Sequence, residues 1–298
     1  MYFANKQKEG ITMKLKWLSM GLLALFCSMA VSAVSAQPAS TWDQIMSSKK
    51  LRIGCASAEP WCFKDVTGSD KPGAVKSGDT VWRGVSVGLG KAIAEAMGVE
   101  LEVVETTWGN AVAALQAGQF DFMFVLDATP QRALAVDFVG PMLWYPVALL
   151  VKDDFKPTTW AEMNDPKYQF GAPIGTTFVA ALQKYVPKAQ IRTFQATNDV
   201  IAAFQAGRID GVTGTGPNAD VARLRLGMGK TIVPMPAVAL STGGAVRKEQ
   251  DRRWRDYLQT VVSYFYETGK TQEFYEQFLA YRGLDPKTAI STRREDWK

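Results

Sequence analysis

Apolar and polar residues alternate along the chain in a pattern that predicts strands separated by helices. Short apolar, β-prone runs predict strands at 51–54, 101–104 and 122–126. Between the first two, apolar residues recur at helical spacing over 87–97, with Ser86 as the expected N-cap and Gly98 as the expected C-cap. A second helix is expected over 108–117. Such β-α-β-α-β alternation is typical of a mostly parallel sheet.

The rest of the chain repeats this alternation of strands and helices and then ends in a crossing segment and two helices. Strands are expected at 148–151, 170–174, 191–194 and 209–212, and helices at 178–185 and 199–206. An apolar, proline-interrupted run at 232–241 is expected to cross back to the first lobe. Two helices, at 254–268 and 274–281, should then pack on that lobe. The polar, glycine-rich stretch 64–82 is expected to form a hairpin or a surface loop.

Two short segments nearly repeat each other. AALQAGQFD begins at Ala113 and AAFQAGRID begins at Ala202, and six of their nine positions are identical. Their separation is too long for a solenoid repeat and fits one copy in each of two similar lobes. In each copy the end of a helix meets a glycine cap, Gly118 or Gly207, before a strand begins. Lobe one is expected at 37–146 and 240–298, and lobe two at 147–239, with a ligand-binding cleft between them.

The N-terminus has the features of a cleavable signal peptide. Two lysines precede an apolar run over 17–31, and small residues end it at Ala36. We expect a signal peptide over residues 1–36, with translation starting at Met1 or Met13 and export to the periplasm. A membrane anchor is the alternative, but the run is shorter than a span of about 20 residues.

Composition narrows the range of functions. The 298 residues are 47% hydrophobic and 21% charged, which is ordinary for a soluble globular protein. Residues 1–36 hold four lysines and one glutamate, so the net charge falls from +5 to +2 without them. A net charge of +2 is too small to indicate a protein that binds nucleic acid. The chain has no histidine, which excludes Ser-His-Asp and Cys-His catalytic groups and histidine-ligated metals.

Two cysteines, Cys55 and Cys62, follow the expected signal peptide. In an oxidising compartment a disulfide between them would stiffen the loop that they enclose. The alternative is two reduced thiols that lie too far apart to be bridged. We expect the disulfide.

Several motifs occur in an order typical of one family. They are LRIG at 51–54, Pro60-Trp61, KAIAEAMGVELEVVETTW at 91–108, AALQAGQFD, ATPQRALAVDFVGPM at 128–142, the Gly-Thr-Thr turn at 175–177, AAFQAGRID, and GGAVRKEQ at 243–250. Over about 51–284 the chain thereby resembles the amino-acid-type periplasmic solute-binding proteins, which are the family 3 extracellular solute-binding proteins of ATP-binding cassette (ABC) importers.

The resemblance implies a fold and a function. The fold is α/β, the two-lobed type II periplasmic binding protein fold, with mixed, mostly parallel sheets and two hinge-crossing strands. The function is capture of an amino acid or related small carboxylate by a monomer. Delivery to an inner-membrane permease would follow, with no chemistry on the ligand, no metal and no other cofactor.

The same resemblance marks residues that would hold the ligand's carboxylate. Arg132 ends a Thr-x-x-Arg pattern that begins at Thr129, and its guanidinium is expected to clamp the carboxylate by two parallel hydrogen bonds. Thr176 and Thr177 follow Gly175 at the start of a helix, where free N–H groups attract anions. A plain threonine N-cap is the alternative for that turn, and the two interpretations are compatible.

The remaining candidate residues concern the ligand's side chain and its ammonium group. Trp61 and Trp108 stand where the family places walls against the ligand, with core packing as the alternative. Thr215 stands where members usually have an aspartate that pairs with the ammonium. Either Asp127 or Glu59 replaces that carboxylate, or the ligand has no amine. Asp127 could also be a turn residue or an internal partner of Arg132.

The sequence is also compatible with two other functions. The first is a dehydratase-like enzyme on the same fold, in which Glu59 or Asp127 would have to supply acid–base catalysis. The second is a sensor or accessory subunit that binds an amine-free organic acid and acts through a separate receptor. A binding protein without catalysis is the expected function.

Overall fold

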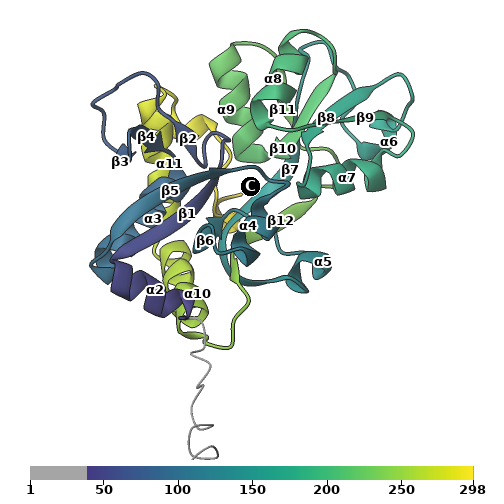
Figure 1. Cartoon of the computed structure of the whole chain (residues 1–298). Helices are drawn as coiled ribbons and strands as arrows, with labels where there is room; N and C mark the ends of the chain where they lie inside the picture. Colours follow the sequence, from purple (N-terminus) through teal and green to yellow (C-terminus); the bar gives the residue numbers. More distant parts are fainter. Residues whose placement is uncertain (1–38, 298) are drawn as a thin grey trace, which may run out of the picture. The chain divides into compact units, whose positions relative to one another are not determined.

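The computed structural model describes residues 39–297, so the expected signal peptide at 1–36 lies outside the described residues. Within residues 39–297, no helix is long and apolar enough to cross a membrane. The elements from Thr41 onward form two groups joined by shared strands (Figure 1). We call these groups lobe one and lobe two.

Lobe one is built around parallel strands with helices beside them. Its elements before the shared strands are α2 (Thr41–Ser48), β1 (Lys50–Ala56), α3 (Val85–Met97), β5 (Glu100–Thr106), α4 (Ala111–Gln116), β6 (Phe122–Phe124) and α5 (Pro130–Ala133). Strand β1 pairs in parallel with β5 and with β6. A small antiparallel sheet contains β2 (Phe63–Lys64), β4 (Thr80–Arg83) and β3 (Val75–Ser77), which confirms a hairpin within 64–82.

Two long strands connect the lobes. Strand β7 (Val136–Val151) pairs with the antiparallel strand β12 (Ala239–Arg247) along its first part and with β10 (Gly211–Thr215) along its second. The sequence predicted only the end of β7, at 148–151, because Gly140-Pro141 interrupts the apolar pattern and reads as a break. The predicted boundary between the lobes at residues 146 and 147 falls inside β7, so it does not coincide with the end of a strand. The limits of the lobes therefore stay a prediction.

Lobe two repeats the parallel arrangement of lobe one. Its elements are α6 (Trp160–Met163), β8 (Gln169–Pro173), α7 (Thr177–Tyr185), β9 (Gln190–Phe194), α8 (Thr197–Gln205), β10, α9 (Gly216–Leu226) and β11 (Lys230–Ile232). Strand β8 is parallel to β9 and β10. The strand order through both lobes is β5-β1-β6-β12-β7-β10-β8-β9, with β11 paired to β7.

The two copies of the sequence repeat have equivalent structural roles. In lobe one, Leu115 and Phe120 are buried in one hydrophobic cluster, and in lobe two Phe204 and Ile209 are buried at the matching positions of another. The glycine caps take left-handed φ angles, 66° at Gly118 and 68° at Gly207. Both copies therefore close a helix and bury the same apolar positions in their own lobe.

The aspartate that ends each copy tethers the neighbouring strand. The Asp121 carboxylate accepts a hydrogen bond of 2.8 Å from the backbone N–H of Arg52 and also pairs with the Arg52 guanidinium. The Asp210 carboxylate accepts one of 2.9 Å from the backbone N–H of Gln169 and pairs with Lys152. These two aspartates therefore stabilise the strands of their own lobes.

The start of α3 corrects one prediction. The N-cap is Gly84, not Ser86, which lies buried inside the helix. Gly84 has φ of 119°, and a Cβ atom there would come 2.3 Å from the carbonyl oxygen of Trp61. A glycine is required by this close approach, which local capping rules do not reveal. Gly98 is confirmed as the C-cap, with φ of 66°.

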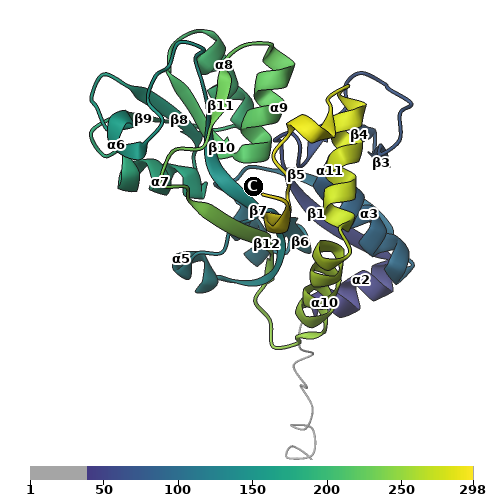
Figure 2. The ribbon, with the colours of Figure 1, turned by 180° about the vertical axis from the view of Figure 1, so that it is seen from behind.

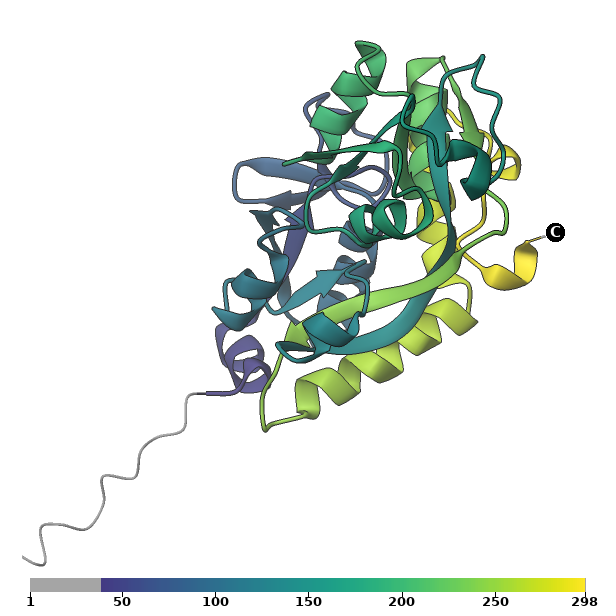
Figure 3. The ribbon, with the colours of Figure 1, turned by 90° about the vertical axis from the view of Figure 1, so that its right-hand side faces the viewer.

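The C-terminal part of the chain contacts the elements of both lobes. Helices α10 (Arg253–Glu267) and α11 (Lys270–Tyr281) are followed by the segment 285–297, which contains the short 3-10 helices η1 (Pro286–Thr288) and η2 (Arg294–Asp296). In the rear view of Figure 2 this segment lies in front of the shared strands. The carbonyl of Thr292 accepts from the N–H of Trp144 in β7, and the N–H of Ile290 donates to Asp220 in α9. Figure 3 shows α10 alongside β7 and β12 with this segment near their upper part.

The loop after β1 carries the expected disulfide. Cys55 and Cys62 are bonded, with Cα atoms 5.8 Å apart, which confirms that the short loop can close. Both residues are buried in the core of lobe one. The disulfide therefore anchors the loop that carries Glu59 and Trp61.

Candidate functional site

A cavity lies between the two lobes. It holds about 920 Å³ of space free of atoms, part of it open to solvent. The residues predicted from sequence that line it are Glu59, Trp61, Trp108, Asp127, Arg132, Thr176 and Thr215. The other two predicted residues, Thr129 and Thr177, lie beside it and contact Arg132 and Asp127.

Arg132 is held at the cavity by backbone groups of both lobes. Thr129 caps the short helix α5, and its hydroxyl accepts from the N–H of Arg132. The guanidinium donates to the carbonyl of Asp127 at 2.7 Å and, across the cleft, to the carbonyl of Gly175 at 2.5 Å. Burial lowers the pKa of Arg132 and the charge of Asp127 opposes this shift, so the group stays cationic. Within the described residues, one N–H on each terminal nitrogen stays available.

The carboxylate of Asp127 is held by hydroxyl groups, while the Arg132 guanidinium bonds to the backbone carbonyl of the same residue. Its carboxylate accepts from Tyr145 at 2.8 Å and from Thr177 at 2.5 Å. Burial, together with the charge of Asp127, raises the pKa of Tyr145 well above its usual value, so the phenol keeps its proton and remains a donor. A carboxylate has about four acceptor positions, so Asp127 can accept further hydrogen bonds.

The start of α7 faces the cavity from lobe two. Thr176 is the N-cap, but its hydroxyl donates to the carbonyl of Pro173 at 2.7 Å instead of capping the helix. The backbone N–H groups of the first turn are therefore left without a side-chain cap. They lie next to Gly175, which accepts from Arg132, so the positive end of a helix and a guanidinium meet at one end of the cavity.

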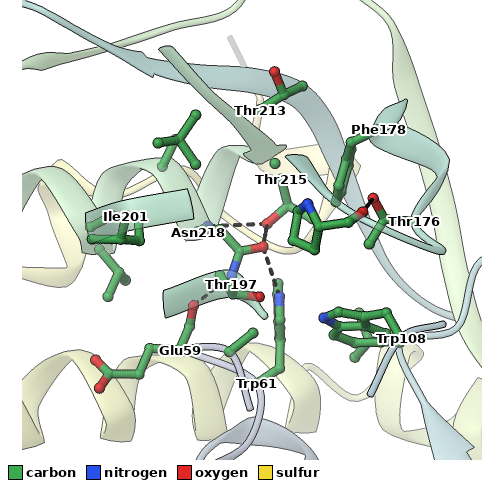
Figure 4. A pocket seen from close by; sticks show the side chains of 18 of the residues that line it. Glu59, Trp61, Trp108, Thr176, Phe178, Thr197, Ile201, Thr213, Thr215 and Asn218 are labelled. Atoms are coloured by element: carbon green, nitrogen blue, oxygen red, sulfur yellow. Dashed lines mark hydrogen bonds between the residues drawn. The ribbon is translucent and has the colours of Figure 1, made fainter. Parts of the chain in front are cut away.

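The start of α9 joins the lobes through Asn218, which was not predicted from the sequence. Asn218 accepts from the indole N–H of Trp61 at 3.0 Å and donates to the carbonyl of Glu59 at 2.5 Å (Figure 4). Thr215 is the N-cap of α9, and its hydroxyl bonds to Asn218. Helix α9 was not predicted, although Thr215 followed by Gly-Pro is a helix-start signal.

Glu59 points away from the other candidate ligand groups. In Figure 4 its carboxylate lies on the side of Trp61 opposite to Trp108. It is bound by two guanidinium groups, that of Arg225 in α9 at 3.1 Å and that of Arg282 at the end of α11. Since both cations already neutralise it, Glu59 is a poor candidate for holding a ligand's ammonium group.

Comparison with known proteins identifies the family of this chain. Residues 65–281 match the model of the bacterial extracellular solute-binding proteins, family 3. The chain belongs to this family.

Individual members differ widely from the chain in sequence. The L-arginine-binding protein of Pseudomonas aeruginosa is 24% identical over 216 residues, which are 70% of this chain and 74% of that protein. An ancestral amino acid-binding protein, described as a precursor of cyclohexadienyl dehydratase, is 28% identical with a TM-score of 0.68, covering 80% of this chain and 99% of that structure. An amino acid ABC transporter substrate-binding protein of Streptococcus pneumoniae, bound to L-arginine, has a TM-score of 0.70 at 22% identity, covering 81% and 98%.

Family membership settles the fold and the general activity. The mixed α/β structure is that of type II periplasmic binding proteins, as the sequence predicted. Members of this family are extracellular binding proteins, so the chain is a solute-binding protein and not an enzyme. Besides Asn218, Tyr145 and Arg225 line the cavity without having been predicted from the sequence, because they belong to elements whose extent or existence was not predicted.

Proposed function

We propose that this solute-binding protein captures an amino acid between its two lobes and presents it to the permease of an ABC importer. The observation that carries the proposal is the placement of Arg132 and Asp127 at the same end of the cavity, with opposite charges and unfilled hydrogen-bonding capacity. A free amino acid carries a carboxylate and an ammonium on one carbon atom. Two adjacent groups of opposite charge match this zwitterion.

The carboxylate of the ligand would lie against Arg132. The available N–H groups of its guanidinium and the uncapped first turn of α7 are both suited to a carboxylate. Because Arg132 comes from lobe one and α7 from lobe two, a carboxylate held by both would favour the closed arrangement of the lobes.

The ammonium of the ligand would lie against Asp127. This residue takes the role that Thr215 cannot fill, since the Thr215 hydroxyl already bonds to Asn218. Tyr145 and Thr177 keep the carboxylate oriented through hydroxyl donors, which add no positive charge. Trp61 and Trp108 would flank the rest of the ligand (Figure 4).

The cellular setting follows from the N-terminus and from the relatives. A basic, apolar segment ending at Ala36 would direct the chain to the periplasm and be removed there. The relative named as an ABC transporter substrate-binding protein supports the permease of such an importer as the partner. We expect this permease to lie in the inner membrane and the receptor to be a monomer. Mass spectrometry of the periplasmic fraction should find a chain beginning at Gln37.

Calorimetric titration tests the proposed ligand class. The chain from Gln37 would be unfolded, dialysed free of endogenous ligand, refolded and titrated with amino acids and with their 2-hydroxy analogues. We expect the amino acids to bind at least tenfold more tightly than the analogues. Asp127→Asn should reduce that difference, while Asp79→Asn, at an exposed position, should not. Tighter binding of the amine-free acids would show that the ligand is an organic acid instead.

A further inference from the structure

The cavity has a second end, away from Arg132 and Asp127, where apolar side chains contribute to the lining. On the lobe-two side it is lined by Ile201, Val212, Ala219 and Ala222, and on the lobe-one side by Ala58. These side chains carry no polar atoms, whereas Thr197, Asn198 and Thr213 of lobe two contribute uncharged polar groups to the cavity wall. A ligand's side chain that extends from the zwitterion site toward this end therefore meets apolar and uncharged polar groups, with Glu59 and Arg225 as the charged residues there.

The carboxylate at this second end, that of Glu59, is already paired with two guanidinium groups. Its side chain is 12% exposed, and it pairs with Arg225, which also lines the cavity, and with Arg282. We call these three residues the Glu59 cluster. The cluster carries one negative and two positive charges, so its net charge is positive. A cationic ligand side chain that reached it would find no free anion.

We infer that this site selects amino acids with an uncharged side chain and that the Glu59 cluster disfavours cationic ones. The inference rests on the proposed function, because it concerns the side chain of the same amino-acid ligand. It separates this chain from the relatives that bind L-arginine, despite the shared fold.

The wall formed by Trp61 does not reverse this selectivity. Aromatic rings can attract a guanidinium through cation–π contact. However, the ring of Trp61 stacks on Tyr275 and its N–H donates to Asn218, so part of its surface is already occupied. The nearby guanidinium of Arg225 would also repel a second cation in a partly enclosed cavity.

A panel of amino acids of similar size tests the inference. The refolded chain from Gln37 would be titrated with L-leucine and L-methionine against L-lysine, and with L-phenylalanine against L-arginine. We expect each neutral ligand to bind at least tenfold more tightly than its cationic counterpart. Lysine or arginine binding as tightly as the neutral ligands would overturn the inference but leave the proposed function intact. A chain that binds none of the amino acids would overturn both.

One substitution tests the role of the cluster directly. Arg225→Gln removes one of the two cations that neutralise Glu59, so the affinity for lysine relative to leucine should rise about tenfold. Arg223→Gln is the matched control, because Arg223 is on the same helix but faces Asp220 and does not line the cavity. Melting curves would verify that both variants fold. An unchanged lysine-to-leucine ratio in Arg225→Gln would show that the cluster does not set the selectivity.

Discussion

Gly175 of lobe two lies directly against Gly109 of lobe one. A Cβ atom built on Gly175 would come 2.5 Å from the Cα atom of Gly109, whereas one built on Gly109 would meet nothing closer than 3.8 Å. The backbones of the two lobes therefore touch at a point where only one of the two glycines is sterically required. Gly175 also has φ of 77°, which favours glycine.

This asymmetry predicts different effects for two alanine substitutions. Gly175→Ala should hold the lobes apart and weaken ligand binding at least tenfold, which corresponds to about 1.4 kcal/mol. Gly109→Ala should change the affinity less than threefold. Calorimetry with the best amino-acid ligand measures both. Equal effects of the two substitutions would mean that this contact does not limit closure.

Arg132 should tolerate no replacement by another cation. Arg132→Lys keeps the charge but loses the planar fork that can bond a carboxylate and two carbonyl groups together, so affinity should fall about 10- to 100-fold. Arg252→Lys changes the same side chain at an exposed site and should have no effect. Wild-type affinity in Arg132→Lys would place the carboxylate elsewhere.

The pair Asp65–Arg83 should make stability depend on pH. Burial raises the pKa of Asp65, but hydrogen bonds from Thr67 and Arg83 outweigh it and hold the pKa well below the ordinary value of 3.8. The folded chain thus binds this proton less readily than the unfolded chain does. The stabilisation is complete above about pH 5 and is lost as the pH falls below the unfolded-state pKa. Denaturant titrations at pH 7 and pH 3 measure the loss.

A substitution isolates this ion pair from other acidic groups. The side chains of Asp65 and Arg83 are 0% and 3% exposed, so Asp65→Asn leaves a buried guanidinium without its counter-charge and should cost about 3 kcal/mol at pH 7. It should also reduce the pH dependence below pH 5. Asp70→Asn, at an exposed position in the same loop, serves as the control. An Asp65→Asn variant with wild-type pH dependence would assign the acid sensitivity to other carboxylates.

The C-terminal segment should contribute to stability although it lies beyond the family match, which ends at residue 281. Removing residues 285–298 exposes the surface that Ile290 covers on Gly216 and breaks the bonds of Thr292 with Trp144 and Gln272. We expect a loss of about 2 kcal/mol and a melting temperature lower by roughly 4–8 °C. Removal of Lys298 alone is the control. An unchanged melting temperature would show that the segment is only a surface tail.

Local pattern was sufficient for most elements of this protein. Strands and helices such as 51–54 and 178–185 follow from apolar periodicity, and the two aligned repeats indicated two similar lobes, because these signals depend on neighbours a few residues apart. The resemblance to a family, rather than periodicity, pointed to Arg132, Asp127, Trp61 and Trp108, which line the cavity between the lobes. The disulfide of Cys55 and Cys62 was also correctly expected, since it closes a short loop.

Only the tertiary structure showed which distant residues contact the side chains and glycines of the candidate site. Glu59 is separated from Arg225 and Arg282 by more than 150 residues in the sequence, so only the fold could reveal that its charge is neutralised. The requirement for glycine at 84 and 175 likewise comes from backbone segments that approach from elsewhere. Periodicity reports which face of an element is buried, but it carries no information about which distant charge or carbonyl group lies opposite.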